Sequence, residues 1–316
     1  MKIIDEIRER AASLQKTIVL PRSSDERVLK AAEFLVREKL CEVVLIKNEG
    51  IDLKTDLIVL DPSNAPELNK YAISFFEKRK HKGVTEEQAF EIVKDPLFFA
   101  ASMVAEGDAN GCVAGSVSTT GDVLRAAIQT IGLKAGSNVV SSIFLMSFED
   151  GRVFSFGDCA VVPYPTEEQL ATIAIDSAAS HKALTGEEPK VAMLSFATKG
   201  SAKHERVDLV EKAFVLAKEK NPLLKIDGSL QFDAAYVDSI GKRKSPGSEV
   251  AGSANVFIFP NLDAGNIGYK ITERLAGATA TGPVIQGLAK PMMDLSRGCS
   301  WEDIVNTSCV AALLSE

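Results

Sequence analysis

Short apolar runs alternate with amphipathic stretches along almost the whole 316-residue chain. The apolar runs predict buried strands at 17–20, 41–46, 57–60, 112–117, 139–145, 191–196, 226–232 and 254–259. The amphipathic stretches predict helices at 24–38, 66–79, 85–94, 97–106, 166–183, 203–219 and 264–275. Strands that alternate with helices in this way favour an α/β fold, with mostly parallel sheets covered by helices on both faces.

The length of the chain and one charged turn indicate two domains. A chain of 316 residues is longer than one hydrophobic core usually needs. The apolar pattern breaks at 144–150, where FLMSFED runs into a charged turn, so we place the change of domain there. No linker rich in Gly and Ser separates the halves, and we therefore expect a rigid hinge.

The composition narrows the class of protein. Hydrophobic residues make up 46% of the chain and charged residues 25%, as in globular proteins. A net charge of −7 argues against general nucleic-acid binding, and no apolar run approaches the roughly 20 residues that span a bilayer. The N-terminus carries no apolar signal region, so we expect a cytoplasmic protein without a membrane partner. Five scattered cysteines and three histidines show no metal-ligand spacing, which predicts reduced thiols and no metal site.

A candidate phosphate site follows the predicted strand at 112–117. The segment 114–129 reads AGSVSTTGDVLRAAIQ and brings Ser118, Thr119 and Thr120 to the start of a helix that also carries Arg125. Helix N-termini with nearby hydroxyls bind phosphate well, although the same residues could simply cap the helix. The segment matches neither a dinucleotide fingerprint nor a P-loop.

Other candidates are weaker by themselves. Arg79 lies in a basic run that could be an exposed face, and Lys270 and Arg274 follow glycines after a predicted strand, where open sheets bind ligands. Cys159 has an acidic neighbour and no adjacent histidine, so we interpret it as packing or lining a site. The histidines lie on charged segments that we expect to be exposed, and Trp301 is expected to anchor the C-terminal helix.

The segment 277–303 combines three kinds of chemistry within eight positions. Ser296 offers a hydroxyl, Arg297 a guanidinium and Asp303 a carboxylate, around the start of a C-terminal helix. Acyl transfer between a phosphate and a thiol needs a hydrogen-bond donor for the oxyanion, an anion clamp and a base. The spacing of these three residues by itself suggests an acyl-transfer site.

Five stretches together resemble the phosphate acetyl/butyryltransferase family and lie in the family's order. They are RKHKGVT at 79–85, STTGDVLRAAIQ at 118–129, FGDCAVVPYPTEEQLATIAIDSA at 156–178, FPNLDAGNIGYK at 259–270 and GPVIQGLAKPMMDLSRGCSWEDIVN at 282–306. The similarity covers essentially the whole chain and looks closer to the acetyl branch, the phosphotransacetylases.

This resemblance implies a reaction and an architecture. The reaction is acetyl phosphate plus coenzyme A giving acetyl-CoA and phosphate, reversibly, with coenzyme A as a substrate and without metal or redox cofactor, in acetate metabolism. The fold would be two α/β domains like those of isocitrate and isopropylmalate dehydrogenases, with the active site in the cleft between them and a homodimeric assembly. In that fold the C-terminus returns to the first domain, which gives domains of 1–146 plus 293–316 and of 147–292.

The resemblance also assigns residues. It places the catalytic Ser-Arg pair at Ser296 and Arg297, the base at Asp303, and two further functional arginines at Arg79 and Arg125. We add Ser118, Thr119, Thr120, Lys270 and Arg274 as expected substrate contacts. The family usually has Arg-Pro where this chain has Arg125-Ala126, a change that we expect to be tolerated.

Three alternatives stay open at this point. A phosphate butyryltransferase would run the same reaction on a longer acyl chain, and a few pocket side chains decide between the two. An oxidative decarboxylase of the same fold would need a cluster of metal-binding aspartates and a nicotinamide site, and the sequence suggests neither. A non-catalytic, regulatory coenzyme A-binding module is disfavoured because Ser296, Arg297 and Asp303 are all present.

Overall fold

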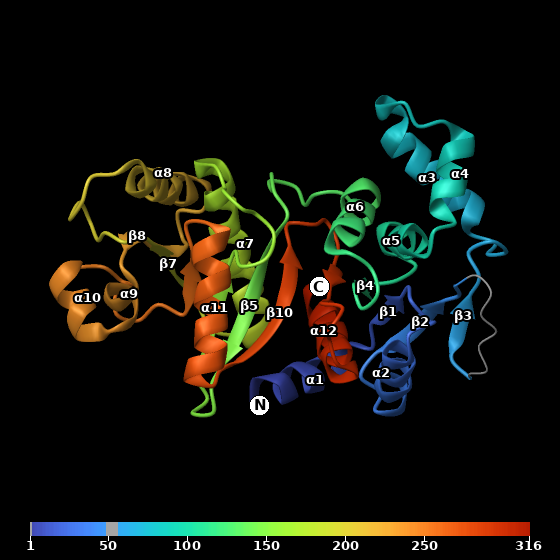
Figure 1. Ribbon diagram of the computed structural model, residues 1–316, viewed down its shortest axis with the longest axis horizontal. Helices are drawn as coiled ribbons and strands as arrows, with labels where there is room; N and C mark the ends of the chain where they lie inside the picture. Colours follow the sequence, from blue (N-terminus) through green and yellow to red (C-terminus); the bar gives the residue numbers. More distant parts are fainter. Residues whose placement is uncertain (1, 49–55) are drawn as a thin grey trace. The chain divides into compact units, whose positions relative to one another are not determined.

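The computed structural model describes residues 2–48 and 56–316, and it divides the chain into two compact units. The terminal unit joins Ile4–Ala135 to Leu288–Glu316, and the central unit consists chiefly of Gly136–Gly287. Each unit contains one sheet with its helices, as Figure 1 shows. Within the described residues, no helix is both long enough and apolar enough to cross a membrane.

The terminal unit holds a five-stranded sheet in which every neighbouring pair is parallel, in the order β11-β4-β1-β2-β3. Its strands are β1 (Thr17–Leu20), β2 (Glu42–Ile46), β3 (Ile58–Leu60), β4 (Gly111–Ala114) and β11 (Met292–Asp294). Its helices are α1 (Lys2–Leu14), α2 (Glu26–Arg37), α3 (Leu68–Arg79), the short 3₁₀ helix η1 (Lys80–Lys82), α4 (Glu86–Val93), α5 (Pro96–Glu106), α6 (Thr120–Thr130) and α12 (Trp301–Leu314). Helices α5 and α12 both pack on β4 and β1, so β4 is fully buried and β1 is buried from Ile18 to Leu20.

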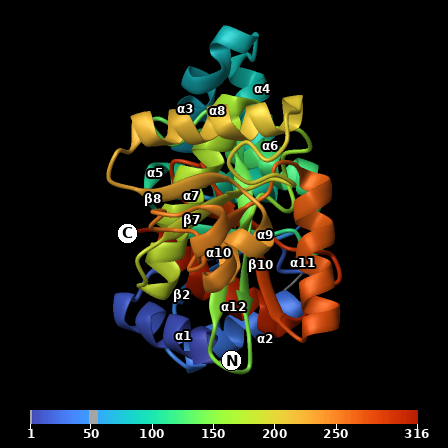
Figure 2. The same ribbon diagram turned by 90° about the vertical axis from the view of Figure 1, so that its left-hand side faces the viewer.

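The central unit holds a six-stranded mixed sheet in the order β10-β5-β6-β9-β7-β8. The pairs from β6 to β8 are parallel, whereas β5 pairs antiparallel with β10 and β6. Its strands are β5 (Ser141–Ser147), β6 (Val153–Gly157), β7 (Lys190–Leu194), β8 (Lys225–Leu230), β9 (Val256–Ile258) and β10 (Thr279–Gln286). Its helices are α7 (Glu167–Thr185), α8 (Glu205–Lys220), α9 (Phe232–Tyr236), α10 (Asp238–Lys244) and α11 (Leu262–Ala276). Figure 2 shows α11 running alongside β10, which it contacts together with β5 and β6.

The predicted α/β fold with mostly parallel sheets is confirmed, but some details differ. The strand predicted at 112–117 ends at Ala114, because Gly115 turns the chain with φ of +103°. The strand predicted at 226–232 ends at Leu230, and Phe232 begins α9. The hydrophobic pattern did not predict the strands β6, β10 and β11.

The structure also tests two predictions about single side chains, of which one was wrong and one is confirmed. The expectation that all three histidines are exposed was wrong for His181, which is fully buried in α7. Its Nδ1 lies 2.9 Å from the Ser155 hydroxyl, and burial lowers its pKa to about 4. Trp301 anchors α12 as expected, because its ring packs against Phe34 of α2 with centroids 5.2 Å apart.

Candidate active site

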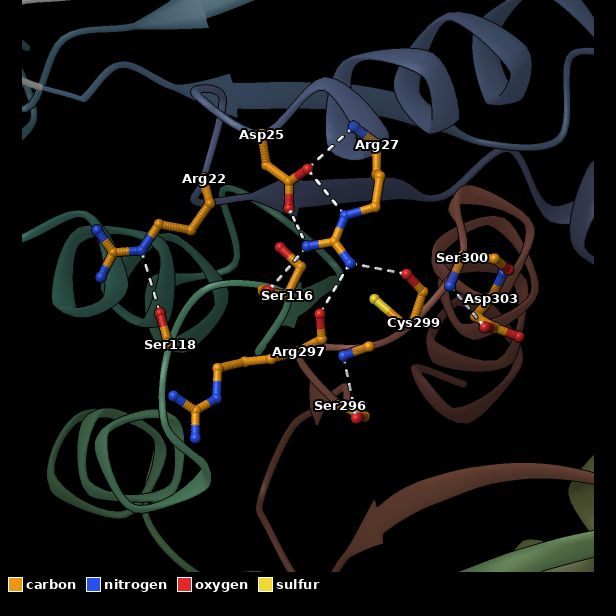
Figure 3. Close-up of polar contacts among 11 residues, drawn as sticks. Arg22, Asp25, Arg27, Ser116, Ser118, Ser296, Arg297, Cys299, Ser300 and Asp303 are labelled. Carbon is orange, nitrogen blue, oxygen red and sulfur yellow. Dashed lines mark hydrogen bonds and ion pairs between the residues drawn. The ribbon is translucent and has the colours of Figure 1, made fainter.

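The predicted catalytic residues gather beyond the carboxyl ends of three neighbouring strands of the terminal unit. Strands β11, β4 and β1 are adjacent and parallel, so the loops that follow them meet at one edge of the sheet. Ligands of open α/β sheets bind at this edge. Figure 3 shows the Arg27 guanidinium between these loops, with Ser118 and the Arg297 guanidinium on one side of it and Asp303 on the other.

The loop after β4 is held against the end of β11. Gly115 lies so close to that strand that a side-chain Cβ would come within 2.3 Å of the Leu295 carbonyl oxygen, so only glycine fits. The loop ends at Thr119, which caps α6 by accepting a hydrogen bond from the Asp122 N–H. Ser118 is buried, and its hydroxyl accepts a hydrogen bond from Arg22 Nε at 3.1 Å.

The three hydroxyls of this loop differ in what they can still offer a ligand. Thr119 donates to the Asp122 carboxylate at 2.7 Å, and Thr120 donates to Asp294 at 2.6 Å. A hydroxyl has one proton to donate. Within the described residues, Ser118 is therefore the one of the three whose proton has no acceptor, and Thr119 and Thr120 build the loop.

The loop after β11 carries the predicted Ser-Arg pair. Ser296 and Arg297 are both exposed, and the Ser296 hydroxyl accepts a hydrogen bond from the Gly298 N–H at 3.2 Å. Its proton remains available to a ligand. The Arg297 guanidinium forms no ion pair or hydrogen bond within the part of the chain that the structure describes.

Asp303 lies in the first turn of α12 and takes part in its cap. Ser300 caps the helix by accepting from the Asp303 N–H, and the Asp303 carboxylate accepts from the Ser300 N–H at 2.8 Å. The carboxylate is exposed, and one of its oxygens has no partner among residues 2–48 and 56–316. This helix cap was not predicted from the sequence, although the S-x-x-D spacing at 300–303 is typical of a capping box.

Arg27 ties all three loops together. Its guanidinium donates to the carbonyls of Arg297 and Cys299 at 2.9 and 2.8 Å and to the Ser116 carbonyl at 2.9 Å. It also forms a two-point ion pair with Asp25, the residue that caps α2. Burial alone would raise the pKa of Asp25, but the hydrogen bonds from Arg27 and Ser116 outweigh it and hold that pKa below its usual value.

Asp294 is a buried carboxyl at the end of β11, two residues before Ser296. One oxygen accepts from Thr120, and the other is buried without a hydrogen-bond partner among residues 2–48 and 56–316. Burial raises the pKa of Asp294 to about 6, although the Thr120 hydrogen bond opposes this shift. Near neutral pH the group is thus close to its own titration.

The two further predicted arginines have different surroundings. Arg125, in the second turn of α6, is largely exposed and forms an ion pair with Asp122 at 2.7 Å. Arg79 ends α3, and its Nε is buried without a hydrogen-bond partner in the part of the chain that the structure describes. A buried donor of this kind costs free energy until something accepts from it.

Lys270 and Arg274 belong to the central unit, where both lie exposed on α11. Lys270 Nζ lies 5.8 Å from the centre of the Tyr269 ring, and Arg274 is 3.5 Å from Glu273. Cys159 is fully buried in the same unit, and burial raises its pKa well above that of a free thiol, which suits packing. Among the described residues, no group of three or more His, Cys, Asp or Glu side chains could hold a metal ion.

Comparison with known proteins decides the family. The family profile "Phosphate acetyl/butaryl transferase" matches residues 2–312. The chain belongs to this transferase family. It is 47% identical to a phosphate acetyltransferase of Thermoanaerobacterium thermosaccharolyticum, over 100% of both chains.

Solved structures of the transferase family agree with the fold. The EutD phosphotransacetylase from Staphylococcus aureus matches with a TM-score of 0.92 and 41% identity, over 100% of this chain and 98% of that one. A putative 4-hydroxythreonine-4-phosphate dehydrogenase from Salmonella typhimurium, 11% identical, matches with a TM-score of 0.52 over 96% of this chain and 99% of that one. This second match concerns the fold alone, and it bears out the expected likeness to dehydrogenases.

In this transferase chain, sequence reasoning missed Arg22, Arg27 and Asp294. For Arg27 a signal existed, because a cation in the first turn of a helix opposes the helix dipole and implies a partner that compensates. Asp294 could have been noted as the one acid in an otherwise apolar strand. Nothing in the local sequence distinguishes Arg22 from an ordinary surface arginine.

Proposed function

We propose that the chain transfers an acetyl group between acetyl phosphate and coenzyme A, reversibly, giving acetyl-CoA and phosphate. Relatives named phosphate acetyltransferase, at 44–47% identity and nearly full coverage, support the reaction. The single observation that carries it is the state of Ser296, Arg297 and Asp303. Within the described part of the chain, this short segment offers a hydroxyl proton without an acceptor, a guanidinium without a partner and a carboxylate oxygen without a donor.

The first step needs a thiolate, because the thiol form of coenzyme A is a poor nucleophile. Asp303 would accept the thiol proton on the oxygen that the Ser300 cap leaves free. Transfer of the proton in concert with attack suits an exposed carboxylate, since it does not require a full equilibrium deprotonation. The cap would also fix the direction in which this carboxylate points.

The thiolate would then add to the acetyl carbonyl carbon, and the C=O electron pair would move onto oxygen. Ser296 would donate its hydroxyl proton in a hydrogen bond to this oxyanion. Collapse of the intermediate breaks the bond between the acyl carbon and the phosphate oxygen. Direct attack within a ternary complex needs no acyl-enzyme, and the buried, protonated Cys159 offers no competing nucleophile.

Arg297, the Ser118 hydroxyl and the start of α6 would hold the departing phosphate. Thr119 and Thr120 would contribute by shaping that loop through their bonds to Asp122 and Asp294. Arg79 and Arg125 would contact phosphate groups of the substrates, and Lys270 and Arg274 remain proposed contacts from the central unit.

We also propose the setting that accompanies this reaction in the family. The active site would lie in a cleft between domains of 1–146 plus 293–316 and of 147–292. The protein would work in the cytoplasm as a homodimer in acetate metabolism, with coenzyme A as substrate and without a metal or redox cofactor. An exposed apolar stripe on α11, formed by Ile267, Ile271 and Leu275, supports the dimer.

The test is the loss of the coenzyme A thiol, followed with a thiol reagent, with acetyl phosphate and with butyryl phosphate as donors. Rapid loss with acetyl phosphate and slow loss with butyryl phosphate is the expected result. A preference for butyryl phosphate would make the chain a butyryltransferase. Absence of thiol loss with either donor, in a sample that binds coenzyme A, would overturn the enzymatic proposal in favour of a regulatory module.

A further inference from the structure

Arg22 occupies a place where a substrate could be bound, although nothing in the reaction scheme above uses it. It follows β1, the middle strand of the terminal sheet, by two residues. Its Nε donates to the Ser118 hydroxyl at 3.1 Å and so joins the loop after β1 to the phosphate-binding loop after β4. Figure 3 shows the Arg22 and Arg297 side chains both extending to the side of the loops where Ser118 lies.

The four arginines at this edge of the sheet differ in whether a carboxylate pairs with them. Arg27 is neutralised by Asp25 at 2.8 Å and Arg125 by Asp122 at 2.7 Å. Arg22 and Arg297 form no ion pair within residues 2–48 and 56–316. The N-terminus of α6 adds further positive potential beside them. Two guanidinium groups without a carboxylate partner among the described residues and a helix start together favour the binding of an anion at this edge.

The hydrogen-bond donors at Arg22 point to the same conclusion. Its terminal Nη groups have no acceptor in the described part of the chain, and a guanidinium has five N–H donors. The Ser118 hydroxyl accepts from Arg22, so its own proton is free to be donated alongside. Arg22 and Ser118 together thus present several convergent donors and no acceptor, which matches the needs of a phosphoryl group.

There is room for a ligand next to Arg22. Its side chain lines a cavity of about 650 Å³ beyond the ends of β1, β2 and β3. This volume lies within the range of small-molecule sites. The two lysines of the cavity wall already have carboxylate partners, Lys47 with Asp61 and Lys94 with Glu91. Arg22 is the cation of this wall that has no carboxylate partner among the described residues.

We propose that Arg22 is a substrate-binding residue, which with Ser118 holds a phosphoryl group as a second guanidinium beside Arg297. This inference rests on the proposed function, since both substrates of that reaction carry phosphoryl groups. The group could belong to the acyl phosphate or to coenzyme A, and the chemistry of recognition is the same for both.

The experiment compares the wild-type chain with Arg22→Gln and Arg22→Lys. Arg37→Gln is the matched control, because Arg37 is an exposed arginine of α2 whose ion pair is with Glu38 and whose guanidinium lies over the Phe34 ring. Binding of inorganic phosphate is measured by titration calorimetry, and KM is measured for acetyl phosphate and for coenzyme A. Thermal melting of every variant checks that it is folded.

Loss of charge-assisted hydrogen bonds should weaken phosphoryl binding by roughly 10- to 100-fold in Arg22→Gln. Arg22→Lys should fall between that variant and the wild type, because it keeps the charge but not the planar fork. A weaker affinity for inorganic phosphate together with a higher KM for acetyl phosphate would assign Arg22 to the acyl phosphate. A higher KM for coenzyme A with unchanged phosphate affinity would assign it to coenzyme A.

The proposal falls if Arg22→Gln matches Arg37→Gln in phosphate affinity and in both KM values. Failure of the proposed function gives a different result. In that case the wild type would consume no thiol, while calorimetric titrations of the wild type and Arg22→Gln with inorganic phosphate and with coenzyme A would still decide the role of Arg22.

Discussion

Asp303 serves two purposes in the proposed scheme, as a helix cap and as the base, and substitutions can separate them. Asp303→Asn keeps a side-chain oxygen for the Ser300 N–H but cannot accept the thiol proton. We expect the turnover number to fall about 10²–10⁴-fold, which is the usual contribution of a general base, with the KM of either substrate nearly unchanged. Steady-state kinetics of thiol loss measure this.

Ser300→Ala is the matched control for Asp303→Asn. It removes the hydroxyl that caps α12 but keeps the Asp303 carboxylate. A lost cap costs about 1 kcal/mol of stability, so melting should shift while turnover changes little. Activity of Asp303→Asn within a few-fold of the wild type would show that another group accepts the proton.

Asp294 should give the protein a stability that depends on pH. Its pKa is raised from 3.8 to about 6 in the folded protein, so the folded state binds a proton more tightly than the unfolded state. The contribution to stability is therefore present at low pH and is lost as pH rises through about 6. Between pH 4 and 7.5 the loss should be about 2 kcal/mol.

Asp294→Asn cannot titrate, so the free energy of unfolding of this variant should decline less over the same pH range. Denaturant unfolding at both pH values measures the difference between wild type and variant. Thr120→Val, which removes the hydrogen bond that lowers this pKa, should make the decline steeper. If the free energy of unfolding depended on pH equally in the wild type and in Asp294→Asn, Asp294 would not be the group responsible for this pH dependence.

At the scale of elements, Arg27 determines how three loops are placed relative to one another. Arg27→Gln would lose most of its five hydrogen bonds and leave the nearly buried Asp25 carboxylate without its counterion. Misplacement of a catalytic loop by 1 Å can cost about 10²-fold, so we expect a loss of turnover of that order. Added guanidinium ion should restore part of the activity, which a general loss of folding would not allow.

Arg37→Gln is again the comparison, because it removes an arginine from the same helix without touching a loop. Turnover of Arg27→Gln equal to that of Arg37→Gln would mean that the loops keep their arrangement without the clamp. A fall in turnover that guanidinium does not reverse would instead reflect the unpaired Asp25 carboxylate.

The elements that the sequence predicted are those with a strong local pattern. Amphipathic helices such as α2 and α11 and the apolar strands β1 and β2 follow from spacing alone. Strand β10 lies at the edge of its sheet and carries Gly282 and Pro283 at an irregularity in its pairing with β5. Gly and Pro are tolerated in an edge strand, but in a sequence they argue against a strand. Strand β11 has three residues, and its partner β4 is about 180 residues away in the chain, so nothing local reveals it.

The residues of the candidate site likewise fall into those that local sequence reveals and those that only the fold brings together. Ser296, Arg297 and Asp303 lie within one segment and could be read from it together. Arg27 contacts residues 270 positions away, Thr120 reaches Asp294 across 174 positions, and Arg22 reaches Ser118 across 96. Contacts of this kind depend on the strand order of the sheet, which spacing along the chain does not encode.

At the scale of the whole molecule, α11 of the central unit is where we expect a second copy to pack. Ile267, Ile271 and Leu275 recur every four residues and are 58%, 53% and 84% exposed, which makes one continuous apolar stripe. Light scattering should give about twice the 33.9 kDa mass of one chain for the wild type. Ile271→Glu would bury an unpaired charge in that interface and should give the mass of one chain.

Leu223→Glu separates this specific effect from that of any added surface charge. Leu223 is 92% exposed and lies outside the stripe, so its substitution should leave the dimer intact. A wild-type mass of one chain would show that the homodimer proposal is wrong. A dimer that survives Ile271→Glu would rule out this stripe, because a two-fold interface presents the same patch twice and would have to bury the new charge twice.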